Sequence, residues 1–122
     1  MKPAPRVRAV DKVNAMTPEY VLVLTTLPGD TDASGFARVL VEERLAACVN
    51  VLPPMESFFR WEGDIQRDVE RQIVMKTGRE RVAALWERMR ELHPYDVPEF
   101  IVLPIVDGND GYLRWIGDST TA

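Results

Sequence analysis

The sequence has few of the side chains from which reactive centres are usually built. Its 122 residues include one cysteine, Cys48, and one histidine, His93. A lone cysteine excludes an intramolecular disulfide and suits a reducing compartment. Because the two residues lie far apart in sequence, they give little support for a thiol nucleophile with its base. Cys48 lies in the apolar segment LAACVNV, where we expect core packing. The sequence therefore predicts a protein that is not an enzyme.

Long apolar runs and ligand-binding signatures are also missing. No run approaches the roughly 18 apolar residues that a membrane helix needs, and the N-terminus lacks the apolar core of a secretory signal. The segment PGDTDASG lacks the lysine and spacing of a phosphate-binding loop, and no HExxH or paired-cysteine zinc motif occurs. We expect a cytoplasmic protein without a membrane partner.

Charge is distributed unevenly along the chain. The formal net charge is −4, but from Thr17 onward 11 basic residues stand against 18 acidic ones. A body this acidic is repelled by a phosphate backbone, so we expect no nucleic-acid partner.

We predict that residues 1–16 form a flexible N-terminal extension, with Met16 as an alternative start to Met1. Residues 17–122 are enough for one domain.

The apolar pattern predicts the element order β-α-β-β-α-β, followed by a short C-terminal helix. Asp30 or Asp32 can cap the first helix, and Gly63-Asp64 offers a tight turn for a hairpin. Pro53-Pro54 is expected to interrupt the second strand. Two right-handed crossovers then give an α+β, ferredoxin-like fold, an antiparallel four-stranded sheet with both helices on one face. The expected strands are 19–27, a second strand in two pieces at 48–52 and 57–62, then 65–77 and 99–106. The expected helices are 30–47, 82–92 and a short one after 107–111.

The hairpin is apolar on both faces, since Phe58, Phe59 and Trp61 cannot all point the same way. A sheet that exposed its second face would aggregate as a monomer, so we predict closed association of identical chains. Tyr112 and Trp115 are expected to anchor the last helix to the sheet.

Two sets of side chains are candidate ligand contacts. Glu62, Lys76 and Glu99, with the aromatic Trp61 and Tyr95, combine both charge signs as a small-molecule pocket would. The same residues would also suit a hairpin tip and strand entrance that pack across a subunit boundary, with Glu and Lys paired.

His93 also has two interpretations. It is either a helix-terminal residue whose charge suits the helix dipole, or a ligand for a borderline metal such as copper or zinc.

The segments ERLAACVNVLP, WEGDI, VMKT, HPYDVPE and YLRWI occur in one order between Glu19 and Gly117. In this ordered set the chain resembles the CutA family of divalent-cation tolerance proteins. The resemblance implies a ferredoxin-like subunit, a cytoplasmic location in bacteria, and a homotrimer similar in architecture to the PII signalling proteins. It also implies a link to metal tolerance, with copper binding in some members.

The metal ligands that the resemblance implies are a cysteine at the end of the first strand and two histidines before the PY pair. This chain has Thr25 at the first position and Leu92-His93 at the others, so His93 alone is retained and copper binding is expected to be weak.

Three hypotheses of function follow. The first is a non-catalytic trimeric metal-response protein that binds divalent cations, copper above all. The second is a PII-like signalling or adaptor trimer that binds a small anionic metabolite in inter-subunit clefts through Trp61, Lys76, Tyr95 and Glu99. The third is a scaffold for another protein. A hydrolase of the acylphosphatase type shares the fold order, but TTLPGDTD is acidic where its anion loop needs positive charge.

Overall fold

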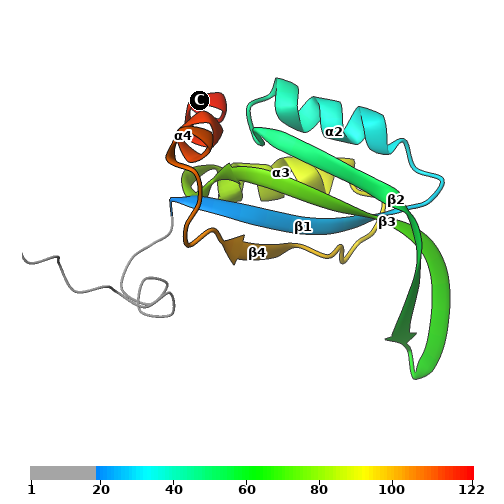
Figure 1. Ribbon diagram of the computed structural model, residues 1–122. Coiled ribbons are helices and arrows are strands. Elements are labelled where there is room, and N and C mark those ends of the chain that lie inside the picture. Colours follow the sequence, from blue (N-terminus) through cyan, green and yellow to red (C-terminus); the bar gives the residue numbers. More distant parts are fainter. Residues whose placement is uncertain (1–18) are drawn as a thin grey trace, which may run out of the picture.

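The computed structural model describes residues 19–122, so the extension predicted for residues 1–16 lies outside the described residues. All three strand pairings are antiparallel, in the order β2-β3-β1-β4. Helices α2 and α3 cover one face of this sheet (Figure 1), which confirms the predicted α+β, ferredoxin-like arrangement. No helix among residues 19–122 is long and apolar enough to cross a membrane. The elements are β1 (Tyr20–Pro28), α2 (Ala33–Glu42), β2 (Cys48–Trp61), β3 (Asp64–Gly78), a 3₁₀ turn (Arg79–Arg81), α3 (Val82–Leu92), β4 (Ile101–Pro104) and α4 (Asp110–Ser119).

The core lies between the sheet and these two helices. Alternate residues of the central strands point into it, and each apolar side chain that is buried there stabilises the fold by about 1.5–3 kcal/mol. The principal core residues are Val21, Val23 and Leu27 of β1, Ile73 and Met75 of β3, Phe36 and Leu40 of α2, and Leu85 and Met89 of α3.

Helix α2 is shorter than its apolar pattern predicted. Asp32 caps its start by accepting a hydrogen bond of 3.0 Å from the backbone N–H three residues later. The helix ends at Glu42 because Arg44 adopts a left-handed φ of 59°. The N–H of Leu45 then returns to the carbonyl oxygen of Leu40 at 3.0 Å, which closes the helix end before the predicted position.

Strand β2 continues through the proline pair that was expected to interrupt it. A bulge between Val51 and Pro54 absorbs the missing backbone donors, and antiparallel pairing with β3 resumes beyond it. As a result, β2 and β3 form one long hairpin in place of two separate pieces of strand.

The hairpin extends beyond the rest of the sheet. Pairing of β3 with β1 stops where Glu70 lies opposite Pro28, so residues 54–69 form an arm of two strands only. The arm curves away from the helix layer (Figure 1). Its side chains alternate between two faces, which places Phe59 and Trp61 on one face and Phe58 on the other, as predicted.

The tip of the arm turns one residue earlier than predicted. Trp61 pairs with Asp64, so the two loop residues are Glu62 and Gly63 and not Gly63-Asp64. Their φ angles are 51° and 84°, as a two-residue hairpin loop of type I′ requires. Glu62 therefore occupies a left-handed conformation that an ordinary L-residue adopts at a cost of about 1 kcal/mol.

Replacing Glu62 by Asn, a residue that tolerates this conformation, should raise the free energy of unfolding by about 0.5–1 kcal/mol. Urea unfolding at a fixed chain concentration would measure the change. Asp64→Asn is the matched control, because it removes one negative charge beside the loop without altering a left-handed residue. If the two variants raise the free energy of unfolding equally, the loss of a negative charge explains the gain, and the explanation from the left-handed conformation of residue 62 is contradicted.

Candidate functional site

The segment HPYDVPE forms a corner after helix α3, which we call the His93 corner (residues 93–99). His93 caps α3 in an extended conformation because Pro94 follows it. Its ring is 7% exposed, with Nε2 2.6 Å from the carbonyl oxygen of Thr26 and Nδ1 3.0 Å from the backbone nitrogen of Tyr95. A carbonyl oxygen can only accept, so Nε2 carries the proton and donates it, while Nδ1 accepts from the Tyr95 N–H.

This environment keeps the imidazole of His93 neutral at pH 7. Burial lowers the pKa of His93, and the hydrogen bond to the Thr26 carbonyl and the charge of Glu70 oppose this effect only in part. His93 is therefore helix-terminal, as one interpretation predicted, but the charge expected to favour the helix dipole is absent.

The positions at which the resemblance implies metal ligands do not surround an open coordination position. Both ring nitrogens of His93 are engaged, and Leu92 has no donor. Thr25 is fully buried on the helix-facing side of β1, and its hydroxyl finds no hydrogen-bond partner among the described residues. Within residues 19–122, no three His, Cys, Asp or Glu side chains gather closely enough to hold a metal ion. The metal contact of His93 stays a prediction.

Two further side chains bond the His93 corner to the sheet. The hydroxyl of Tyr95 donates to Glu70 Oε2 at 3.2 Å. Burial, followed by the charge of Glu70, raises the pKa of Tyr95 to about 12, so the phenol stays a donor. Gln72 Nε2 donates both to the Thr25 carbonyl at 2.7 Å and to Glu99 Oε2 at 2.8 Å. The corner is thus fixed to β1 and β3 by hydrogen bonds.

A cavity of about 940 Å³, which we call the arm cleft, lies between the arm and the His93 corner. Three of the five residues that the sequence singled out, Trp61, Tyr95 and Glu99, line it together. Every charged residue of the lining is acidic. The full lining is Thr26, Met55, Ser57, Phe59, Trp61, Gln66, Asp68, Glu70, Gln72, Pro94, Tyr95, Asp96, Val97 and Glu99.

The other two predicted residues lie elsewhere. Glu62 is in the loop at the tip of the arm. Lys76 lies towards the far end of β3, where its Nζ is 3.2 Å from the hydroxyl of Tyr112 and 5.6 Å from the centre of that ring. This hydrogen bond is the main reason why the pKa of Lys76 is raised. The arm cleft therefore lacks the positive charge that an anionic metabolite would need.

The contact with Lys76 also joins the last helix to the sheet. Ile116 is the buried residue of α4, at 1% exposure, whereas Tyr112 and Trp115 are 43% and 45% exposed. The two aromatic rings pack on each other with their centroids 5.3 Å apart. Tyr112 therefore holds α4 to β3 through Lys76, as predicted, while Ile116 is the α4 residue that is fully buried.

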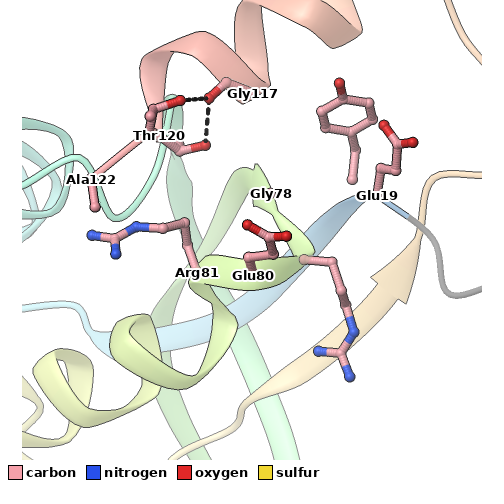
Figure 2. A pocket seen from close by; sticks show the side chains of 10 residues that line it. Glu19, Gly78, Glu80, Arg81, Gly117, Thr120 and Ala122 are labelled. Carbon is pink, nitrogen blue, oxygen red and sulfur yellow. Dashed lines mark hydrogen bonds between the residues drawn. The ribbon is translucent and has the colours of Figure 1, made fainter.

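A second cavity, of about 600 Å³, lies where β1 begins, β3 ends and α4 ends (Figure 2). Its charges are mixed, with Glu80 and Arg81 both in the lining. The hydroxyl of Thr120 donates to carbonyl oxygens within α4, among them that of Gly117. Because acidic and basic side chains stand together in its lining, this cavity does not favour a ligand of one charge sign.

Sequence reasoning missed several residues of the arm cleft, above all Phe59, Asp68, Glu70 and Asp96. Alternation along β3 could have found two of them, since Asp68, Glu70 and Gln72 fall on one face of the strand. The bulge in β2 obscured which residues of the opposite strand share that face.

Comparison with known proteins gives a single family. Residues 21–119 match the model of the family described as CutA1 divalent ion tolerance protein. A divalent-cation tolerance protein CutA from Thermus thermophilus is 46% identical over 99 residues, which is 81% of this chain and 96% of that protein. A CutA homolog from Xenopus laevis is 50% identical over 93 residues, 76% of this chain but only 62% of the relative.

Solved structures agree with the sequence matches. The CutA1 structure from Thermus thermophilus has a TM-score of 0.80 at 44% identity, over 84% of this chain and 99% of that one. CutA1 from a psychrotrophic Shewanella has a TM-score of 0.83 at 36% identity, over 88% of this chain and the whole of that one.

The neutral ring of His93 leads to a prediction about pH. Because its pKa is lowered on folding, the unfolded chain binds the proton more tightly, and stability falls as the pH drops below the unfolded value of about 6.5. At pH 7.5 the free energy of unfolding of His93→Gln should be about 1 kcal/mol lower than that of the parent, because buried hydrogen bonds are weakened. Between pH 7.5 and 5.5 the variant should then lose less of this free energy than the parent does. Urea unfolding at both pH values measures this difference, and parallel pH dependences would contradict it.

Proposed function

Because the chain belongs to the CutA1 divalent ion tolerance protein family, we propose that it acts in the tolerance of divalent cations as a non-catalytic, cytoplasmic homotrimer. Support for the metal-related role comes from the names of its relatives, of which the Thermus thermophilus protein is covered almost completely. The scarcity of nucleophile and base pairs supports a binding role over catalysis.

The homotrimer rests on one observation, the apolar surface that the helices leave uncovered. Phe58 and Ile65 on the arm are 67% and 70% exposed, and Ile101 and Leu103 on β4 are 45% and 40% exposed. Exposed apolar side chains on the arm and on β4 indicate association sites at both places. A closed assembly of identical chains would bury them, and three is the number of chains that the resemblance to the CutA family implies.

Weak copper binding is the second element of the proposal. Nδ1 of His93 is the ring nitrogen with a lone pair, and in this structure that lone pair accepts the Tyr95 N–H. A copper ion bound there would displace this hydrogen bond in a partly buried corner, which lowers the net affinity. Copper is favoured over zinc because nitrogen ligands bind it more strongly.

A second candidate function is a PII-like trimer that binds a small molecule in the arm cleft. It is favoured by the meeting of Trp61, Tyr95 and Glu99 around one cavity. The position of Lys76 argues against the anionic ligand that the sequence suggested, because this lysine bonds to Tyr112 instead.

Introducing a charge on the exposed face of the arm should weaken the homotrimer. Ile65→Lys is expected to shift the assembly towards monomers, measured by native mass spectrometry over a dilution series. Val41→Lys, at a 42% exposed valine on α2 in the helix layer, is the matched control and should leave the subunit count unchanged. A parent protein that is monomeric, or an Ile65→Lys variant that matches the parent at every concentration, would refute the assembly proposed.

Copper uptake can be followed in the same spectra. The tag-free protein should take up copper in saturable steps and in preference to zinc, and His93→Gln should reduce this uptake while keeping the subunit count. Graded, unselective adducts, or uptake that the substitution leaves unchanged, would remove His93 as a copper ligand.

A further inference from the structure

The arm cleft contains a carboxylate that lacks a cationic partner. Glu70 is 8% exposed, and its Oε2 accepts from the Tyr95 hydroxyl. None of the ion pairs among residues 19–122 involves Glu70, and no donor of these residues reaches its Oε1. Buried charges in proteins are normally paired, because an unpaired charge is costly to remove from water. Glu70 Oε1 thus meets solvent in the cavity wall without a donor from the described residues, so it is available to a cation that enters the cavity.

The remaining lining shows what kind of cation fits. Asp68, Asp96 and Glu99 add three carboxylates, and the described part of the lining contains no Lys or Arg. These acids do not converge, since no three metal-ligating side chains among the described residues gather around one point. Carboxylates spread along a wall match charges that are spaced along a molecule better than one compact ion.

The aromatic side chains of the cleft complete the pattern. Phe59, Trp61 and Tyr95 lie in the same lining, where Trp61 is 53% exposed and Phe59 and Tyr95 are half-buried. Aromatic faces attract organic ammonium groups and pack against alkyl chains, whereas a hydrated metal ion gains little from them. A cavity of about 940 Å³ is within the range of small-molecule sites.

We propose that the arm cleft binds an aliphatic amine with more than one ammonium group. Glu70 pairs with an ammonium group in the interior, the three other carboxylates pair with further ammonium groups towards the opening, and the aromatic rings cover the alkyl segments between them. The inference rests on the second proposed function, the ligand-binding cleft, and names the chemical class of its ligand.

Isothermal titration calorimetry of the full chain with spermidine, at constant ionic strength, tests the proposal. We expect saturable binding that Glu70→Gln weakens about tenfold or more, because the amide still accepts from Tyr95 but carries no charge. Trp61→Leu should weaken binding several-fold through the loss of the aromatic face. Glu80→Gln, which removes a carboxylate from the second cavity, is the matched control and should bind as the parent does.

Three further titrants separate the alternatives. A neutral diol of similar length should not bind, and magnesium chloride should bind far more weakly than spermidine. Equal binding of magnesium, or equal affinities of the parent and Glu70→Gln, would show only diffuse attraction to acidic surface and overturn the proposal. Binding of citrate without binding of spermidine would refute the amine while leaving a ligand cleft in place.

The cleft could instead be filled by a basic side chain of a second copy of this chain. In that case spermidine would not bind, and Glu70→Gln would lower the subunit count seen in native mass spectra; this outcome also overturns the proposal. The subunit count and copper uptake of the parent are measured separately, so failure of the amine leaves the metal-tolerance proposal to be judged by its own tests.

Discussion

The early end of β1 determines much of what is distinctive in this molecule. Its pairing with β3 stops at Pro28 opposite Glu70, while β2 and β3 continue as a pair to Trp61 and Asp64. The strands beyond this point lose their third neighbour, so they curve as a two-stranded ribbon away from the helices. The arm cleft and the exposed apolar residues of the arm, Phe58 and Ile65, both follow from this difference in strand length.

The His93 corner forms the opposite wall of the arm cleft and is fixed by side chains that the sequence marked as functional. His93 bonds to the Thr26 carbonyl and Tyr95 bonds to Glu70. Glu99 receives a hydrogen bond from Gln72, which also donates to β1. Each of these contacts positions the backbone after α3, so the corner is structural first. A rigid wall is also what a selective binding site requires, since little conformational entropy is then lost on binding.

The sequence predicted the fold well because its periodicities were clear. Alternation in β1 and β3 and three- and four-residue spacing in α3 fixed the element order, and Pro94 fixed the end of that helix. The candidate site was only partly predictable. Trp61 and Tyr95 belong to distant segments, and their meeting depends on how the arm curves. Placing Lys76 required knowing where α4 lies, which no local pattern records.

The sheet order also has a consequence for how the chain folds during synthesis. Strand β1 leaves the ribosome first among the strands, yet its only partners in the described sheet are β3 and β4. Its apolar sequence YVLVLTTLP cannot begin to pair with β3 before Glu70 has been made and cannot complete this pairing before Gly78, whereas the β2–β3 hairpin closes locally and quickly. Assembly of the core therefore waits for contacts between residues that are distant in sequence, which slows folding. The newly made β1 would be a binding site for chaperones in this interval.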